Sequence, residues 1–332
     1  MKILVVGYGS IGKRHVNNLL KIPNIEIIIY THRSDIDNEI KNKCKIFKSL
    51  NDCIDEKPVA SIISNVTSLH IETALKLASA GLHLFIEKPL SNNLENVEKL
   101  SNIVYDKKLI TFMGYNLRFH NCIKKIKELL ENNEIGKIIS VNAESSSYLP
   151  DWHPDEDYRE SYASKENLGG GVVLTCIHEI DYLHWFFGEI KELFAITGKF
   201  SDLEIEVDDL ASVIMKFSNN VIAELHLDFF QKPDFRCCKI VGTNGTIYWD
   251  SEDNIVKVYD IKLKKWIEKI NIVNYQRNDM YFDEMKYFLD CVNKNENTNN
   301  DIDNGISTLK ITLDIIESSK SKRLVSHGKI II

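Results

Sequence analysis

Three glycines near the start of the chain constrain its fold more than any other feature. Gly7, Gly9 and Gly12 follow a short apolar run, residues 3–6, and open a segment with helical spacing that Pro23 interrupts. Glycines at this spacing let a pyrophosphate approach the backbone, and the N–H groups at the helix start can bind it. The alternative is a tight turn without a ligand. We expect a dinucleotide site with contacts from Gly7, Gly9, Ser10, Ile11 and Gly12.

Apolar strands and helices alternate through the first 117 residues. Such continuous apolar strands are typical of a parallel sheet that is covered on both faces. The chain is therefore expected to begin with an α/β dinucleotide-binding domain, residues 1–117. Its expected strands after the first are residues 25–30, 59–63, 82–86 and 110–114, and its clearest later helices are residues 69–80 and 94–105.

The pattern changes from residue 118 onward, where short strands follow one another with turn signals between them. Asn244-Gly245 is a strong hairpin signal. We expect residues 118–332 to form an α/β domain that binds substrate, with a mostly antiparallel open sheet. One face of that sheet should not stay bare in water, so a homodimer or homotetramer through it is predicted. The expected strands are 137–144, 190–200, 209–217, 221–230, 239–241, 246–250, 255–259 and 266–270, and the expected helices are 121–131, 279–293 and 303–319.

Composition excludes several classes of protein. The 332 residues carry a net charge of −7 with acids and bases mixed, so we expect no nucleic-acid partner. No apolar run approaches the roughly 18 residues of a membrane span, and the first apolar run is too short for a signal peptide. The seven cysteines are odd in number and form no C-x-x-C motif, which favours a reduced, cytoplasmic protein without a metal site.

The segment after the second strand bears on the choice of cofactor. An Asp or Glu commonly binds the ribose of NAD there, but this chain has no acid before Asp35. Thr31, Arg33 and Ser34 are suited to a 2′-phosphate, so we favour NADP over NAD. Three further cofactor contacts are expected after the 59–63 strand, at Asn65, Thr67 and His70.

Lys88 follows the apolar run 82–86, at the carboxyl end of an expected strand, where such folds bind ligands. Glu87 and Lys88 are expected to contact the cofactor, and the Lys88 ammonium is placed to stabilise a developing alkoxide. His178 opens a helix after Gly169-Gly170-Gly171 and is the best candidate for proton transfer. The alternatives are a solvated loop lysine and a structural histidine.

Together these motifs resemble the Gfo/Idh/MocA oxidoreductases. The resemblance rests on Gly7–Gly12, residues 65–70, Glu87-Lys88-Pro89 and residues 114–119, and it continues through residues 134–137, 169–171, 178–181 and 241–250. It implies an N-terminal Rossmann domain joined to an open-sheet α/β domain. It also implies hydride transfer at a secondary alcohol or ketone of a sugar, cyclitol or nucleotide-sugar, with Lys88 in the role given above.

Residues 148–162 resemble a narrower branch, associated with bacterial surface-sugar pathways such as those for nonulosonates. This segment is dense in aromatic and charged side chains and contains two prolines, which is typical of a functional loop. The candidate substrate contacts are Arg118, Trp152, His153, Asp157, Tyr158, Arg159, Tyr162, Thr175 and His178.

One position departs from the family pattern. That branch carries an Asp three residues before the histidine, where this chain has Thr175. A threonine cannot orient His178 as a carboxylate would. The loss is compatible with a slower enzyme, with a substrate that compensates, or with a sensor that binds cofactor without turnover. A hydrolase or lyase that uses NAD for transient oxidation is a further alternative.

Overall fold

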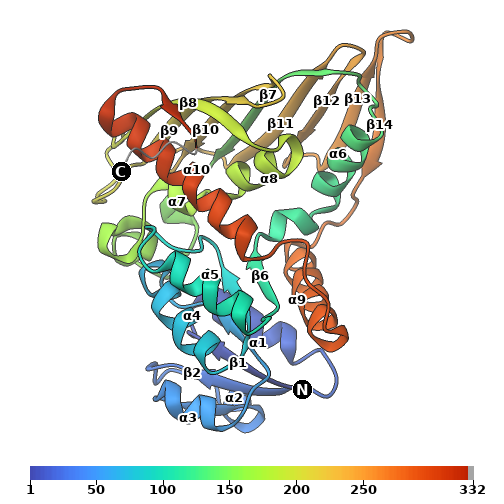
Figure 1. Ribbon diagram of the computed structural model, residues 1–332. Helices are drawn as coiled ribbons and strands as arrows, with labels where there is room; N and C mark the ends of the chain where they lie inside the picture. The colour runs from blue at the N-terminus through green and yellow to red at the C-terminus, as the bar shows by residue number, and fades with distance from the viewer. Residues whose placement is uncertain (328–332) are drawn as a thin grey trace. The chain divides into compact units, whose positions relative to one another are not determined.

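The computed structural model describes residues 1–327 and divides into two compact units (Figure 1). Unit 1 comprises residues 1–116 and 277–309, and unit 2 comprises residues 117–276 and 310–327. The sequence had assigned everything from residue 118 to the second domain. Residues 277–309 instead belong to the first unit, and the packing of their helix explains why.

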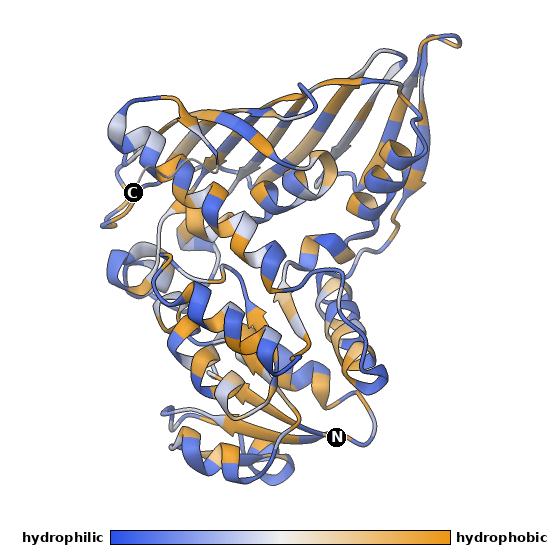
Figure 2. Ribbon diagram, viewed as in Figure 1, coloured by the Kyte–Doolittle hydropathy of each residue, from blue (hydrophilic) through white to orange (hydrophobic). Residues whose placement is uncertain are grey.

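The core of unit 1 is a six-stranded sheet in the order β3-β2-β1-β4-β5-β6, with every pair of neighbours parallel. This order is that of a Rossmann fold, which confirms the predicted fold class. Its central strands are almost entirely buried. Figure 2 shows that these strands are mostly hydrophobic. The strands are β1 (Lys2–Val6), β2 (Glu26–Tyr30), β3 (Lys45–Phe47), β4 (Ala60–Ile63), β5 (His83–Glu87) and β6 (Thr111–Gly114).

Helices flank this sheet, and α9 is the one that the sequence had placed elsewhere. The Asn278 side chain of α9 accepts a hydrogen bond from Arg14 at 3.3 Å and donates one to Asn18 at 2.8 Å. Ten residues further along α9, the Phe288 ring packs edge-on against Phe85 of β5, with 5.7 Å between ring centroids. The helices of unit 1 are α1 (Ser10–Leu19), α2 (Asn38–Lys43), α3 (Leu50–Asp55), α4 (His70–Ser79), α5 (Val97–Asp106) and α9 (Arg277–Lys294).

Unit 2 contains a nine-stranded sheet in the order β14-β13-β12-β11-β7-β10-β9-β8-β15. Its neighbours are antiparallel except β7 and β10, which are parallel, so the predicted mostly antiparallel sheet is confirmed. The hairpin expected at Asn244-Gly245 joins β11 to β12. The strands are β7 (Ile138–Ser146), β8 (Ile190–Gly198), β9 (Leu210–Phe217), β10 (Ile222–Asp228), β11 (Phe235–Gly242), β12 (Gly245–Asp250), β13 (Ile255–Asp260), β14 (Lys265–Asn271) and β15 (Val325–Ser326).

The two faces of this sheet differ. Buried residues alternate with more exposed ones along β8, β9 and β10, and helices pack on one face (Figure 1). The other face presents Phe194, Ile196 and Ile214, which are 39%, 53% and 54% exposed. Besides α10 (Ile302–Ser321), which runs from unit 1 into unit 2, the helices are α6 (Asn121–Glu131), α7 (Val172–Thr175) and α8 (His178–Phe187).

Candidate cofactor and substrate sites

The glycine turn between β1 and α1 is shaped by close backbone contacts. A Cβ on Gly7, whose φ is +92°, would lie 2.7 Å from the carbonyl oxygen of Ser64, and a Cβ on Gly12 would lie 2.2 Å from that of Gly7. A Cβ on Gly9, by contrast, would meet no atom within 4 Å. Gly9 is also the N-cap of α1. The turn therefore presents open backbone at a helix N-terminus, which fits the diphosphate of a dinucleotide.

The end of β2 carries a fixed arginine. The Arg33 guanidinium forks onto Asp35, with Nε 2.9 Å from Oδ1 and Nη2 2.5 Å from Oδ2. These hydrogen bonds lower the pKa of Asp35 to about 2. Thr31 is buried, and its hydroxyl oxygen accepts a hydrogen bond from the Arg33 N–H. A hollow of about 430 Å³ opens here, lined by Arg33, Ser34, Ile36, Lys41, Cys44, Ile46 and Lys48.

The residues expected after β4 hold the neighbouring loops together. The ring nitrogens of His70 lie 2.8 Å from the carbonyl oxygen of Pro89 and 3.1 Å from that of Asn65. His70 is almost wholly buried, and this burial lowers its pKa. The Asn65 side chain donates to Thr73, and Thr67 is buried. His70 thus ties the loop after β4 to the turn that contains Lys88.

The Lys88 turn is fixed from the other side by Glu87, the last residue of β5. Oε1 of Glu87 lies 2.6 Å from Nε2 of His15 on α1, and its Oε2 accepts a hydrogen bond from the Lys88 N–H at 3.3 Å. Gly114 on β6 leaves room for this carboxylate, because a Cβ there would come within 3.1 Å of it. Lys88 itself is half-buried between buried neighbours. A rigid turn therefore presents an ammonium at the carboxyl end of the parallel sheet.

In unit 2, His178 is the first residue of α8 and is 8% exposed. Thr175 ends the preceding short helix and is buried as well. The glycines before it are needed for close packing. A Cβ on Gly170 would lie 2.5 Å from the carbonyl oxygen of Tyr162, and one on Gly171 would lie 2.6 Å from Asp208 Oδ1. Burial raises the pKa of Asp208.

The acids on α8 are engaged by arginines. Arg118 forks onto Asp181, with Nε 2.9 Å from Oδ2 and Nη2 2.7 Å from Oδ1, and both side chains are buried. Arg236 forms an ion pair with Glu179 at 2.8 Å. Arg118 was expected to contact substrate, but this edge of its guanidinium is already occupied by Asp181. The position of Asp181 in a predicted helix did not indicate that it would pair with Arg118.

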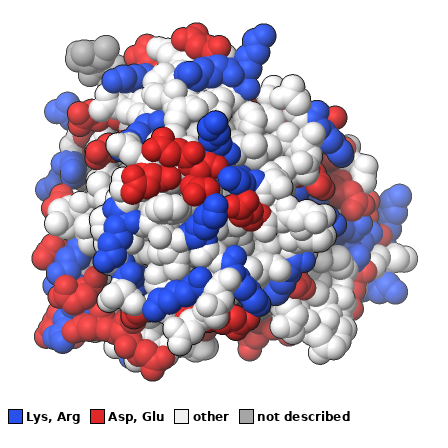
Figure 3. All heavy atoms as spheres, turned by 90° about the horizontal axis from the view of Figure 1, so that it is seen from below, with Lys and Arg blue, Asp and Glu red and all other residues white. Residues whose placement is uncertain are grey.

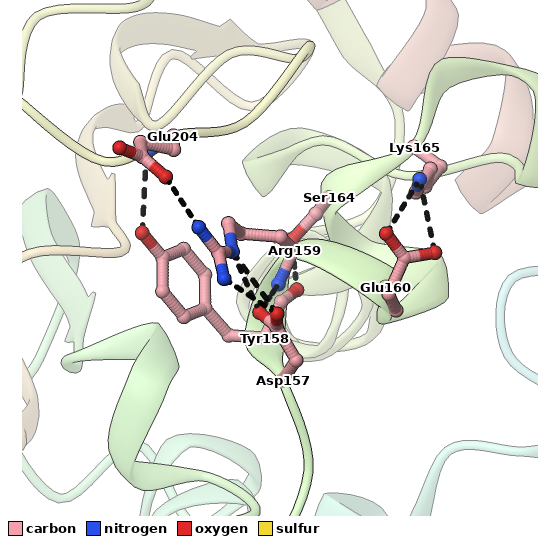
Figure 4. Close-up of polar contacts among 7 residues, drawn as sticks. All are labelled: Asp157, Tyr158, Arg159, Glu160, Ser164, Lys165 and Glu204. Carbon is pink, nitrogen blue, oxygen red and sulfur yellow. Dashed lines mark hydrogen bonds and ion pairs between the residues drawn. The ribbon is translucent and has the colours of Figure 1, made fainter.

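Residues 148–162, the segment expected to contact substrate, contain short helical turns. Figure 4 shows the polar contacts of Asp157, Tyr158 and Arg159 in this segment. Arg159 binds Asp157 through Nε and Nη2, and its Nη1 lies 2.7 Å from Glu204. The Glu204 N–H donates to the Tyr158 hydroxyl at 3.2 Å, so this segment is attached twice to the 199–209 connection. Hydrogen bonds from Arg159 lower the pKa of Asp157 to about 2. Arg159 was expected to bind substrate but is bound to two acids of its own unit.

Trp152, His153 and Tyr158 line one small hollow together with Leu149, Glu156, Asp157 and Ser161. Its volume is about 10 Å³, enough for about one water. The Trp152 indole donates to the Ser147 hydroxyl and packs edge-on against Phe229. Tyr162 is half-buried nearby in the chain. Trp152, His153 and Tyr158, which were expected to contact substrate, thus lie close together, whereas Arg159 points toward Glu204.

Two buried polar residues that act on Glu87, next to Lys88, were not identified from the sequence. They are His15 and Glu284. His15 follows Gly12 by three residues, on the face of α1 that also buries Val16 and Leu19. Glu284 interrupts the apolar stripe of α9 formed by Met280 and Phe288. A polar residue within an apolar helical stripe was the signal that could have identified both.

Basic and acidic side chains are interspersed on the face shown in Figure 3. Within residues 1–327, no helix is both long and apolar enough to cross a membrane. The same residues contain no group of three His, Cys, Asp or Glu side chains arranged to hold a metal ion.

Comparisons with known proteins identify the family. A model described as the oxidoreductase family with an NAD-binding Rossmann fold matches residues 1–115, and the GFO/IDH/MocA C-terminal domain matches residues 123–248. The chain is 28% identical to myo-inositol 2-dehydrogenase of Thermotoga maritima, with 100% of both chains covered. It is 22% identical to levoglucosan dehydrogenase of Pseudarthrobacter phenanthrenivorans, over 76% of this chain and 74% of that protein.

Solved structures agree on the fold. Levoglucosan dehydrogenase in complex with NADH superposes with a TM-score of 0.89 at 18% identity, over 99% of this chain and 100% of that one. A probable dehydrogenase from Thermotoga maritima gives a TM-score of 0.81 at 27% identity, over 99% and 100% of the two chains. The resemblance to the Gfo/Idh/MocA family is confirmed. The chain belongs to the Gfo/Idh/MocA family of oxidoreductases, whose N-terminal Rossmann domain binds NAD.

Proposed function

We propose that this protein is an NAD(P)-dependent dehydrogenase that oxidises a secondary hydroxyl of a sugar or polyol, or reduces the corresponding ketone. The observation that carries the proposal is the Glu87–Lys88 turn. An ammonium on a rigid turn at the carboxyl end of β5 stands where ligands bind in this fold. The relatives named above, which are dehydrogenases of inositol and levoglucosan, support a sugar or polyol as the substrate class.

In this proposal each residue has a defined task. The open backbone at Gly9 and the N-terminus of α1 hold the diphosphate. A bound nicotinamide supplies the hydride acceptor. The Lys88 ammonium binds the substrate oxygen and stabilises its developing negative charge. His178 accepts the hydroxyl proton. Glu87, His15 and His70 act indirectly by fixing the turn that carries Lys88.

Thr175 changes what His178 can do. A carboxylate partner would stabilise the imidazolium that forms when the ring accepts a proton. The buried threonine hydroxyl carries no charge, so we propose that this proton transfer is slower than with the family's Asp. The two nearest acids in sequence, Glu179 and Asp181, are paired with Arg236 and Arg118.

We propose that the sugar contacts the 148–162 segment, through Trp152, His153, Tyr158 and Tyr162. Indole and phenol rings are suited to the apolar face of a sugar, and Trp152, His153 and Tyr158 lie close together in this segment. The composition of this segment is also the support for the narrower proposal of a role in bacterial surface-glycan synthesis.

The preference for NADP over NAD is likewise a proposal. Three basic side chains, Arg33, Lys41 and Lys48, line the hollow at the end of β2, where a 2′-phosphate would need them. Asp35 neutralises part of this charge through its fork with Arg33. The ratio of the Kd values for NADP⁺ and NAD⁺ tests the proposal, and Arg33→Ala and Lys48→Ala should shift that ratio toward NAD⁺.

Assembly and location complete the proposal. The exposed apolar face of the nine-stranded sheet supports a homodimer or homotetramer. A cytoplasmic location is supported by the seven cysteines, all of which are free thiols and buried.

A substrate panel tests the proposed function. Purified protein with NAD⁺ or NADP⁺ should produce the absorbance band of reduced nicotinamide with at least one of myo-inositol, levoglucosan, glucose 6-phosphate or a nucleotide-sugar. Binding of nucleotide without turnover of any of these compounds would favour a sensor instead. Product formation without net reduction of the cofactor would favour a hydrolase or lyase.

A further inference from the structure

Glu284 of α9 is an acid buried in the core of unit 1. Its side chain is 0% exposed, and neither carboxyl oxygen has a hydrogen-bond partner among residues 1–327. Removing an ionised carboxylate from water without a partner costs several kcal/mol. Burial therefore raises the pKa of Glu284 well above its ordinary 4.5, which favours the protonated carboxyl.

The charged groups around Glu284 favour the same state. Glu87 lies close enough for its negative charge to raise the pKa of Glu284 further. His15 on α1 is bound to Glu87, and the Lys88 N–H donates to the same carboxylate. The His15 imidazole is thus bound to Glu87, and neither oxygen of Glu284 has a hydrogen-bond partner among residues 1–327.

The other charged side chains on or near α9 contact other residues or are exposed to solvent. The Arg14 guanidinium of α1 stacks on the Tyr281 ring, 4.5 Å from its centroid, and approaches Asn278. Asp283 and Lys286, the charged neighbours of Glu284 on α9, are exposed. No contact in the described chain therefore compensates a charge on Glu284 directly.

Glu87, whose charge acts on Glu284, belongs to the strand that ends at the proposed catalytic turn. In a Rossmann fold the diphosphate binds after β1 and the adenosine ribose beside β2, so the strands across β1 receive the nicotinamide half. Glu87 is the last residue of one of those strands, β5. An oxidised nicotinamide ring carries a positive charge, and the reduced ring carries none. A nearby positive charge favours the ionised form of a carboxyl group.

We propose that Glu284 links a proton to the oxidation state of the bound cofactor. The carboxyl group stays protonated in the free protein and with NADH, and it releases its proton to solvent when NAD⁺ binds. Binding of NAD⁺ then tightens as pH rises, by up to about tenfold in Kd for each pH unit when one full proton is released. Binding of NADH lacks this contribution. The proposal rests on the cofactor and requires no particular substrate.

Calorimetry tests the linkage directly. The heat of NAD⁺ binding is measured near neutral pH in buffers of different ionisation enthalpy, which gives the number of protons released. We expect the wild type to release up to one proton with NAD⁺ and fewer with NADH. Glu284→Gln should release fewer protons with NAD⁺ than the wild type does. Asp283→Asn removes an exposed acid one residue away and should behave as the wild type. Equal proton release by Glu284→Gln and the wild type would overturn the proposal.

Infrared spectroscopy provides a readout that needs neither turnover nor the variant's binding. In the nucleotide-free protein, the wild-type minus Glu284→Gln difference spectrum should contain the carbonyl band of a protonated carboxylic acid. A difference spectrum with carboxylate bands alone would overturn the proposal. If Glu284→Gln does not fold, the wild-type protonated-acid band should weaken on addition of NAD⁺, and an unchanged band would overturn it. Failure of both nucleotides to bind would contradict the cofactor assignment, whereas the nucleotide-free spectra would still decide the state of Glu284.

Discussion

Arg118 and Asp181 form a buried, two-pronged ion pair, with Nε–Oδ2 and Nη2–Oδ1 distances of 2.9 and 2.7 Å. Removing one partner of such a pair leaves an uncompensated charge, which typically costs about 3–5 kcal/mol. Asp181→Asn should therefore lower the free energy of unfolding by that amount, as measured by urea denaturation. The double variant Arg118→Met/Asp181→Leu, which removes both charges, should lose less. A fully stable Asp181→Asn protein would show that the pair is not structural.

Thr175, three residues before His178, is the second position to test. Thr175→Asp should restore a carboxylate, raise kcat, and move the acid limb of the kcat/KM profile to higher pH, because a nearby carboxylate favours the imidazolium. Thr175→Val keeps the shape without the hydroxyl and serves as the control. A pH profile identical to that of the wild type in Thr175→Asp would argue against His178 as the proton acceptor.

The exposed sheet face predicts the assembly state. Phe194 and Ile214 are directly opposed across β8 and β9 on that face. Light scattering should find a dimer or tetramer for the wild type, and Ile214→Lys should shift it to smaller species. Leu263→Lys is the control, because Leu263 is exposed but lies in the turn between β13 and β14. A monomeric wild type would exclude an interface through this face.

The raised pKa of Glu284 has a consequence for stability that needs no cofactor. The folded protein holds this proton at pH values where the unfolded chain, with an ordinary pKa of 4.5, has lost it. The contribution of Glu284 to the free energy of unfolding therefore falls as pH rises above 4.5, by up to about 1.4 kcal/mol per pH unit, until the folded state also loses the proton. Urea midpoints should show Glu284→Gln gaining on the wild type between pH 5 and 7. A constant difference would mean that Glu284 is ionised in the fold throughout.

Most of unit 1 could be predicted because its signals are local. The glycine turn, the apolar strands and the helical spacing each lie within a short window, and together they specify the sheet. The segment of residues 38–55, with α2, β3 and α3, was missed because its elements are short. The assignment of α9 failed for another reason. An amphipathic pattern shows that a helix has an apolar face, but it does not show which sheet that face covers.

In the candidate site, too, local signals could be predicted and contacts between distant segments could not. Lys88 and His178 could be proposed as site residues because each stands next to the end, or at the start, of an element that the sequence defines. The partners of charged residues could not, since Arg118 with Asp181 and Arg159 with Glu204 are joined by tertiary packing. The parallel pairing of β7 with β10 is equally non-local, because strand order depends on contacts between distant segments.

Lys88→Met provides the most direct test of the central claim. Methionine keeps much of the length of the side chain and removes its charge, so the variant should bind NAD⁺ with a Kd close to that of the wild type. Lys76→Met, at an exposed position of α4, is the matched control. With the substrate found in the panel, single-turnover formation of reduced nicotinamide should be normal in Lys76→Met and reduced by several orders of magnitude in Lys88→Met. Wild-type rates in Lys88→Met would contradict the proposed mechanism.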